Sequence, residues 1–174
     1  MKRSEIAQIA VKHCPGCGGM FADFDGPTHP YIDASPACWK IYGDVLAKEF
    51  NNPEYFKAHR LTVDAYSVQH PGSPGARSSQ SVNVHLVALY LILEQQLKSE
   101  FVTKIIGKLI QLRDRKFDWL SPPKYMGEIN VLHMAQADTA EEHISRVREW
   151  GLSAFNSWKE HHNIIKMLAN LALS

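Results

Sequence analysis

Two of the three cysteines stand in the motif Cys14-Pro-Gly-Cys17, and this turn is the first candidate for chemistry in the chain. The proline fixes one backbone dihedral and the glycine accepts a positive φ, so both sulfurs face a common point, as in a zinc knuckle. Redox thiols share this spacing, but a thioredoxin-like motif follows a strand and opens a helix, whereas two glycines follow Cys17 here. The motif therefore favours zinc, and a redox pair stays as a separate hypothesis.

Tetrahedral zinc needs two further ligands, and helix geometry proposes them. Apolar residues at helical spacing predict helices over 35–50 and 54–70, joined by a turn so short that they must be antiparallel neighbours. At 1.5 Å per residue, Cys38 lies about 18 to 20 Å before this turn and His70 about 24 Å after it, so both reach the same end of the pair. The predicted ligands are then Cys14, Cys17, Cys38 and His70.

Each of the two helical ligands has an alternative interpretation. His29 lies between the cysteines in sequence and is the alternative fourth ligand of a purely local site. Cys38 also fits a small buried apolar residue, and His70 also fits a helix C-cap. The identity of the fourth ligand is therefore open at this point.

A second set of candidates, His59, Asp64, His85 and His161, carries acid-base groups rather than thiols. Counting away from the turn between the second and third helices brings Asp64 level with His85, which predicts a hydrogen bond between them. Such a pair serves a metal ligand or general base, or is a satisfied polar pair in a helical core. An interior that includes His59, His85 and His161 would hold a second metal or a small polar ligand. We expect His13, His133 and His143 at the surface or in first turns.

The elements that position these residues form an all-α fold, a bundle of about five helices with an irregular N-terminal zinc-knuckle segment. Beyond the first two helices, the apolar pattern predicts helices over 78–97, 101–116 and 139–171, and a short element near 129–134. Ser35 is the expected N-cap of the first helix, with Pro36 at its first position. We expect a single domain over 1–174, in which the knuckle segment 1–34 packs on the helices of 35–174.

Composition excludes several classes of function. The chain has 174 residues and a net charge of +1, which gives none of the basic excess that non-specific nucleic-acid binding draws on. Its longest apolar run, Leu86 to Leu93, is far below the roughly 18 residues that cross a bilayer. Nucleotide-binding glycine loops, the hydrolase nucleophile elbow and the His-Glu-x-x-His zinc motif do not occur in the sequence. We expect a cytoplasmic protein that binds neither nucleic acid nor membrane.

The motifs, taken together, resemble an uncharacterised family of small bacterial proteins, a domain of unknown function. They are CPGCG (14–18), DGPTHPYI (25–32), SPACW (35–39), HRLTVDAY (59–66), QHPG (69–72) and QSVNVHL (80–86). The resemblance implies a bacterial origin and no activity. A looser likeness of architecture is to DinB-like helical bundles, which bind a metal through three histidines on separate helices and from which the cysteine knuckle departs.

Two functions follow from these residues. The first is a zinc-binding protein whose metal is structural and which acts as a module for an unknown small molecule or protein partner. The alternative is a metal-dependent hydrolase or transferase with its catalytic site in the helical bundle. Coordination number separates them, because a structural zinc has four protein ligands and a catalytic zinc keeps one position open.

Overall fold

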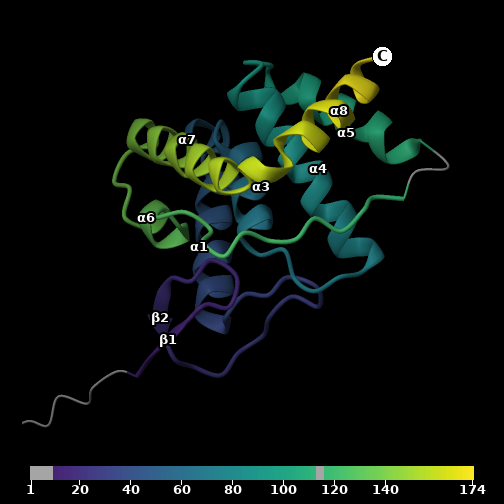
Figure 1. The fold of residues 1–174 in the computed structure, drawn as a ribbon. Helices are drawn as coiled ribbons and strands as arrows, with labels where there is room; N and C mark the ends of the chain where they lie inside the picture. Colours follow the sequence, from purple (N-terminus) through teal and green to yellow (C-terminus); the bar gives the residue numbers. More distant parts are fainter. Residues whose placement is uncertain (1–9, 113–115) are drawn as a thin grey trace, which may run out of the picture.

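A computed structural model describes residues 10–112 and 116–174, and within these ranges the chain is mostly helical (Figure 1). In chain order the elements are β1 (Val11–His13), β2 (Met20–Ala22), α1 (Pro36–Asn51), α2 (Pro53–Phe56), α3 (His59–Gln69), α4 (Ala76–Leu93), α5 (Ser99–Gln111), α6 (Val131–Ala135), α7 (Ala140–Ser157), the 3-10 helix η1 (Lys159–His161) and α8 (His162–Leu173). The expectation of a single domain over 1–174 stays a prediction, and its first nine residues lie outside the described ranges.

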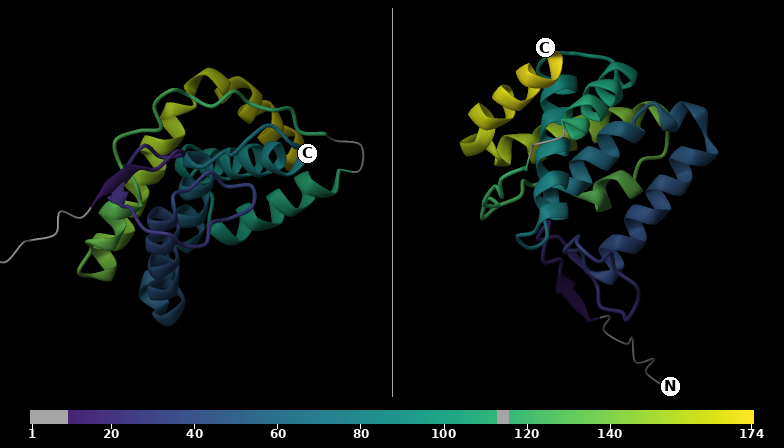
Figure 2. Two further views of the ribbon diagram at one scale, coloured as in Figure 1. Left: turned by 90° about the horizontal axis from the view of Figure 1, so that it is seen from below. Right: turned by 90° about the vertical axis from the view of Figure 1, so that its right-hand side faces the viewer.

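Helix α4 lies at the centre of the fold, because it is apolar on nearly every face from Val84 to Leu93. It packs against α3, α5, α7 and α8. Helix α3 is enclosed between α4 and α7, while α1 packs against α2 and α6. In Figures 1 and 2 the hairpin lies at one end of the molecule and α8 at the other.

The N-terminal segment corrects the all-α expectation. Strands β1 and β2 pair antiparallel, with Val11 opposite Ala22 and His13 opposite Met20. The predicted irregular knuckle is therefore the turn of a two-stranded hairpin. Period-2 alternation over three residues is too short a signal to separate such strands from a loop.

Two of the predicted long helices are each broken in the structure. The helix expected over 54–70 is α2 followed by α3, with a break at Lys57 and Ala58. The helix expected over 139–171 ends at Ser157, where Trp158 takes φ −91° and ψ 18° and η1 redirects the chain into α8. The indole of Trp158 donates to the carbonyl of Val68 at 3.1 Å, so tertiary packing sets the position of this break.

Other helix ends follow local sequence signals. Ser35 caps α1 as expected, since its Oγ accepts from the backbone N–H of Cys38, and Pro36 is the first helical residue. The short element expected near 129–134 is confirmed as α6. Helix α5 ends at Gln111, earlier than the predicted end near residue 116, and residues 113–115 of that prediction lie outside the described ranges.

An extended segment, residues 116–130, runs across the helices from the end of α5 toward α6, and we call it the strap (Figure 1). Side-chain amides of the bundle hold the strap through hydrogen bonds to its backbone carbonyls. Gln69 donates to the carbonyls of Met126 and Ile129 at 2.7 and 2.8 Å, and Asn83 donates to the carbonyl of Asp118 at 2.9 Å. Buried amides thus replace the regular hydrogen bonding that the strap lacks.

No helix in the described ranges combines the length and the apolar character that a bilayer crossing requires.

Candidate metal centre

The first two cysteines lie in the hairpin turn, where the backbone folds back on itself. The N–H of Cys14 donates to the carbonyl of Gly19 at 2.8 Å, and the N–H of Gly18 donates to the carbonyl of Cys14 at 2.9 Å. Gly18 has φ +72°, a left-handed conformation that glycine adopts without steric cost. The turn presents both thiols to the interior, where Cys14 is 1% and Cys17 7% exposed.

Cys38 reaches the same point from the first turn of α1. Its backbone N–H is held by the Ser35 cap, and its side chain is fully buried. The amide end of a helix carries partial positive charge, which favours the thiolate form of a cysteine placed there. Helix α1 therefore supplies both the position and part of the electrostatic environment of the third sulfur.

His70 follows the last residue of α3 and turns its ring toward the sulfurs. Its Nδ1 lies 2.7 Å from the carbonyl oxygen of Tyr66, and a carbonyl only accepts, so Nδ1 carries the hydrogen. Nε2 is then the ring nitrogen that faces the cysteines, and it lies 3.4 Å from the sulfurs of both Cys14 and Cys38. A backbone carbonyl that fixes the ring in this way is the usual support of a metal-binding histidine.

The four side chains form a compact group that fits a tetrahedral metal ion. Their ligand atoms all lie within 4.8 Å of one another, and the sulfurs of Cys17 and Cys38 are 4.0 Å apart. Tetrahedral zinc with bonds of 2.3 Å to sulfur would place two sulfurs about 3.8 Å apart. The structure thus brings together Cys14, Cys17, Cys38 and His70, the set that helix geometry proposes, in a buried group that could hold a metal ion.

Close packing around Gly16 shows how tightly the turn sits against α3. A Cβ on this residue would overlap Cδ2 of His70 and lie 2.8 Å from the carbonyl oxygen of Gln69. Only a hydrogen fits at this position. The glycine of the Cys-Pro-Gly-Cys motif is therefore needed for contact with the fourth side chain of the group as well as for the turn.

Polar groups outside the four side chains support the sulfurs. The backbone N–H of Ser35 donates to the sulfur of Cys14 at 3.4 Å, and the hydroxyl of Tyr66 lies 3.4 Å from the sulfur of Cys38. The ring of Tyr66 is stacked between those of Tyr42 and His70, at centroid distances of 3.7 and 4.0 Å. This stack fixes the hydroxyl beside the group.

Electrostatics within the group call for a cation. Hydrogen bonds with Cys17 and Cys38 hold the pKa of the Cys14 thiol far below its ordinary value, while hydrogen bonds with Cys14 and Cys17 raise that of Cys38. Burial lowers the pKa of His70, but hydrogen bonds with Cys14 and Cys17 outweigh it and raise the pKa to about 9. One thiolate in the group therefore suppresses ionisation of the next. A bound dication would let all three thiols ionise together and would displace the proton from Nε2 of His70.

His29, the alternative fourth ligand, lies outside the group. It is half-buried in the loop before α1, where its ring packs against those of Tyr31 and Trp39 at centroid distances of 4.3 and 5.3 Å. Its position is that of an aromatic packing residue.

The predicted hydrogen bond between Asp64 and His85 is confirmed. Nδ1 of His85 lies 2.7 Å from Oδ1 of Asp64, whose side chain is fully buried. The other carboxylate oxygen of Asp64 accepts from Nε of Arg60 at 2.8 Å. The pair is therefore part of a three-residue network between α3 and α4.

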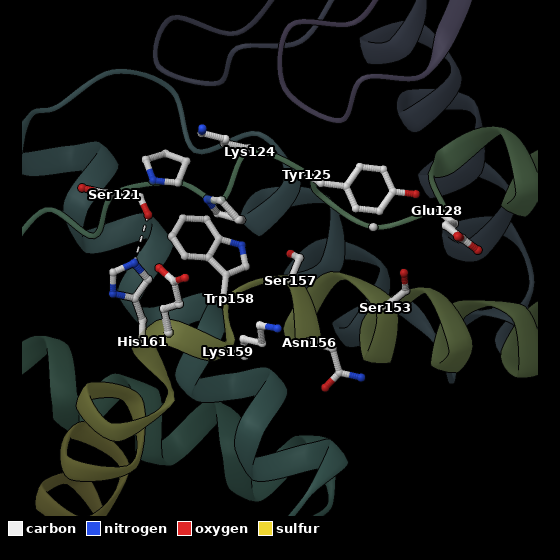
Figure 3. A pocket seen from close by; sticks show the side chains of 14 residues that line it. Ser121, Lys124, Tyr125, Glu128, Ser153, Asn156, Ser157, Trp158, Lys159 and His161 are labelled. Atoms are coloured by element: carbon white, nitrogen blue, oxygen red, sulfur yellow. Dashed lines mark hydrogen bonds between the residues drawn. The ribbon is translucent and has the colours of Figure 1, made fainter.

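The shared interior expected for His59, His85 and His161 is wrong. Nδ1 of His59 lies 2.8 Å from Oε2 of Glu49, whereas His161 lies where the predicted last helix breaks. There its Nε2 donates to the carbonyl of Ser121 at 2.9 Å, beside the indole of Trp158, at the rim of a hollow of about 820 Å³ under the strap (Figure 3). Within the described ranges, the only group of histidine, cysteine and acidic side chains arranged for a metal is the Cys3His group.

Glu49 and His143 are the residues that the sequence analysis missed. Both side chains are fully buried and share a 2.8 Å hydrogen bond. His143 lies in the first turn of α7, which is one of the two places expected for it, but it is not at the surface. The spacing of buried residues along α1 and α7 could have identified both of them. Glu49 continues the buried stripe of Tyr42 and Val45 on α1, and His143 begins the stripe of α7 that continues with Val147, Trp150 and Ala154.

Most of the chain matches a protein family model. Residues 12–159 match the family model DUF5946, described as a family of unknown function, and this range includes all four side chains of the Cys3His group. The resemblance to an uncharacterised family is thereby confirmed. No curated protein and no solved structure matches the chain significantly. The likeness to DinB-like bundles stays a prediction.

Proposed function

The chain belongs to DUF5946, a family of unknown function, and from its own residues we propose that it is a zinc-binding helical protein in which the metal is structural. The zinc joins the N-terminal hairpin to the ends of α1 and α3. The helices would then present a binding surface for a small molecule or a protein partner.

The closed ligand set carries this proposal. All four side chains of the Cys3His group are buried, with His70 2% and Cys38 0% exposed. Four protein ligands complete a tetrahedral zinc, and no solvent reaches a further position at this depth. A catalytic zinc would need one position open to water or substrate.

The two strands of the hairpin bury only one side chain. Phe21 is buried, but Val11 and Met20 are 53% and 50% exposed. A two-stranded hairpin alone is only marginally stable in water. The zinc would therefore strengthen an attachment that otherwise rests on Phe21 and the packing of the turn against α3.

The donor set favours zinc over the other common metals. Three thiolates and one imidazole suit zinc or iron and are poor ligands for magnesium or calcium. The three cysteines are free thiols, which fits a reducing compartment, and we include a cytoplasmic location in the proposal.

The alternative, a metal-dependent hydrolase or transferase, has less support. Its four candidate residues form hydrogen bonds with different partners, His59 with Glu49, His85 with Asp64 and His161 with Ser121. An enzyme of this kind needs its acid-base groups within reach of one reacting atom. The closed Cys3His group adds no open coordination position.

Metal analysis of the purified chain tests the proposal. Mass spectrometry of digested protein should give one zinc per chain, and X-ray absorption should give three sulfur neighbours and one nitrogen neighbour. An oxygen neighbour in place of one protein ligand, or a second metal per chain, would instead support the enzyme alternative. Absence of metal after reconstitution with zinc under reducing conditions would overturn the assignment.

A variant pair separates the role of the metal from that of the bundle. Cys17→Ser keeps the size of the side chain but removes a thiolate, so zinc content should fall to near zero and amide exchange over residues 10–35 should rise. The far-UV signal of the helices should stay largely intact. Met20→Ser, on the exposed face of β2, is the matched control and should keep its zinc. Full zinc content in Cys17→Ser would show that the knuckle is not the site.

A further inference from the structure

A hollow of about 760 Å³ opens between α2, the first turn of α3 and the start of α5. The polar side chains that line it include His59, Arg60, Lys98 and Thr103. Two of them, the neighbours His59 and Arg60, are held from behind by fully buried carboxylates. The hollow lies away from the Cys3His group and shares no lining residue with it.

His59 is oriented so that one ring nitrogen stays available. Its Nδ1 donates to Oε2 of Glu49 at 2.8 Å, and the side chain is 21% exposed. The rings of Phe50 and Phe56 pack against it at centroid distances of 4.6 and 4.9 Å and limit its rotation. Nε2 forms no hydrogen bond with residues 10–112 or 116–174, so it is free to bind a ligand in the hollow.

A buried carboxylate also fixes Arg60, and part of its guanidinium remains available to a ligand. Nε donates to Oδ2 of Asp64 at 2.8 Å, and Nη1 approaches the hydroxyl of Thr103 on α5 at 3.5 Å. Nη2 forms no hydrogen bond with the residues that the structure describes. A guanidinium has five N–H donors in a rigid fork suited to carboxylate and phosphate oxygens.

The charge of the lining is positive, and part of the wall is apolar. Lys57, Arg60 and Lys98 face the hollow with Glu100 as the acidic residue among them, and Lys57 pairs with Glu54 at the surface. Phe56, Val63 and Leu97 supply the apolar wall. A ligand that fits both parts has an anionic head and an apolar body.

We propose that this hollow binds a small organic anion, a carboxylate or phosphate group carried on an apolar body. Arg60 and Lys98 bind the anionic head, His59 forms a further hydrogen bond through Nε2, and the apolar body packs against Phe56, Val63 and Leu97. The buried carboxylates of Glu49 and Asp64 are costly unless each has a partner. Their partners are His59 and Arg60, which are thereby held in place at the hollow. This inference gives the proposed binding module a ligand class and does not depend on the metal.

Nuclear magnetic resonance titration of the full, zinc-loaded chain tests the proposal. The probes are octanoate and octyl phosphate, with octylammonium and inorganic phosphate as comparisons, all below micelle-forming concentrations. Octanoate or octyl phosphate should give saturable amide shifts confined to residues 56–63 and 97–103, with a dissociation constant on the order of 1 mM or tighter. Octylammonium should bind at least tenfold more weakly, which tests the charge of the site.

Matched variants locate the binding. Lys98→Gln removes an exposed positive charge at the hollow. The affinity for the anion should fall roughly tenfold, because one charge-assisted contact is lost. Arg60→Lys keeps a positive charge beside Asp64 but loses the forked donors of the guanidinium. The affinity for the anion should fall to a similar extent. Lys108→Gln, on α5 but outside the lining, is the control and should bind as the unaltered chain does.

Three results would overturn the proposal. They are equal binding of octylammonium and octanoate, equal affinity in Lys98→Gln and Lys108→Gln, and inorganic phosphate binding as tightly as octyl phosphate. None of them bears on zinc content, so failure here is distinguishable from failure of the metal assignment.

Discussion

Glu49 on α1 and His143 on α7 lie 94 positions apart in sequence, and Nε2 of His143 donates to Oε1 of Glu49 at 2.8 Å with both side chains fully buried. The same carboxylate also accepts from Thr62 and His59 on α3. One buried acid therefore joins three helices. Nδ1 of His143 has no partner among the described residues, so the ring depends on Glu49 for its hydrogen bonding.

Glu49→Ala should destabilise the fold by about 3 kcal/mol, because it leaves the buried donor of His143 without an acceptor and Thr62 with only the longer hydrogen bond to the carbonyl of Ala58. Urea unfolding at neutral pH measures this change. Asp44→Ala, on the exposed side of the same helix, is the control and should shift the free energy of unfolding by no more than about 0.5 kcal/mol. A loss below about 1 kcal/mol in Glu49→Ala would contradict the central role of the carboxylate.

Gly16→Ala should loosen the metal group without touching a ligand. The added methyl would meet Cδ2 of His70 and the carbonyl oxygens of Gln69 and Asp33, all closer than 3.0 Å, so the turn must move away from α3. We expect at least a tenfold loss of zinc affinity, measured by competition with a chromophoric chelator. Gly43→Ala, at an open position on α1, should bind zinc normally. Equal affinities in the two variants would contradict the close approach.

Gln69→Leu should release the strap. Gln69 donates to the carbonyls of Met126 and Ile129 and accepts from the indole of Trp150, so the variant loses three buried hydrogen bonds. We expect a loss of roughly 3 kcal/mol and faster tryptic cleavage after Lys124, an exposed strap residue. Gln80→Leu, on the exposed face of α4, should be cleaved at the original rate. Unchanged cleavage in Gln69→Leu would show that other contacts hold the strap.

Glu142 should make stability depend on pH in the acid range. The backbone N–H of Asp138 and the guanidinium of Arg146 hold the pKa of its carboxyl below the ordinary value of 4.5. A lowered folded-state pKa stabilises the fold above 4.5, and this contribution is lost as pH falls through the folded-state value. The Tm of Glu142→Gln should therefore lie below that of the unaltered chain at neutral pH and converge with it as the acid titrates. A Tm difference that stays constant with pH would contradict this linkage.

The geometry of the Cys3His group was predictable because it depends on two regular quantities. The rise per residue of a helix and the shortness of the turn after α1 place Cys38 and His70 at the same end without knowledge of any contact. The hydrogen bond between Asp64 and His85 was predictable for the same reason. Each relationship joins helices that are neighbours in sequence.

What the sequence could not give depends on contacts between distant elements. The break at Trp158 is set by the carbonyl of Val68 on α3, and no local signal at Trp158 encodes that partner. His143 is buried against Glu49 on α1. The spacing of buried residues on α1 and α7 places each residue on a buried face, but it does not identify the two as partners. The hairpin was missed because each strand has only three residues, fewer than periodicity can resolve.

The Cys3His group also changes what determines the stability of the folded chain. Cys14 and His70 are 56 positions apart, so an ion bound to both would tie together elements that are distant along the folded chain. An ion that binds only the folded chain adds about 1.4 kcal/mol for each tenfold rise in its free concentration above the dissociation constant. The melting temperature of the N-terminal part would then report the zinc supply of its surroundings as well as the amino-acid sequence.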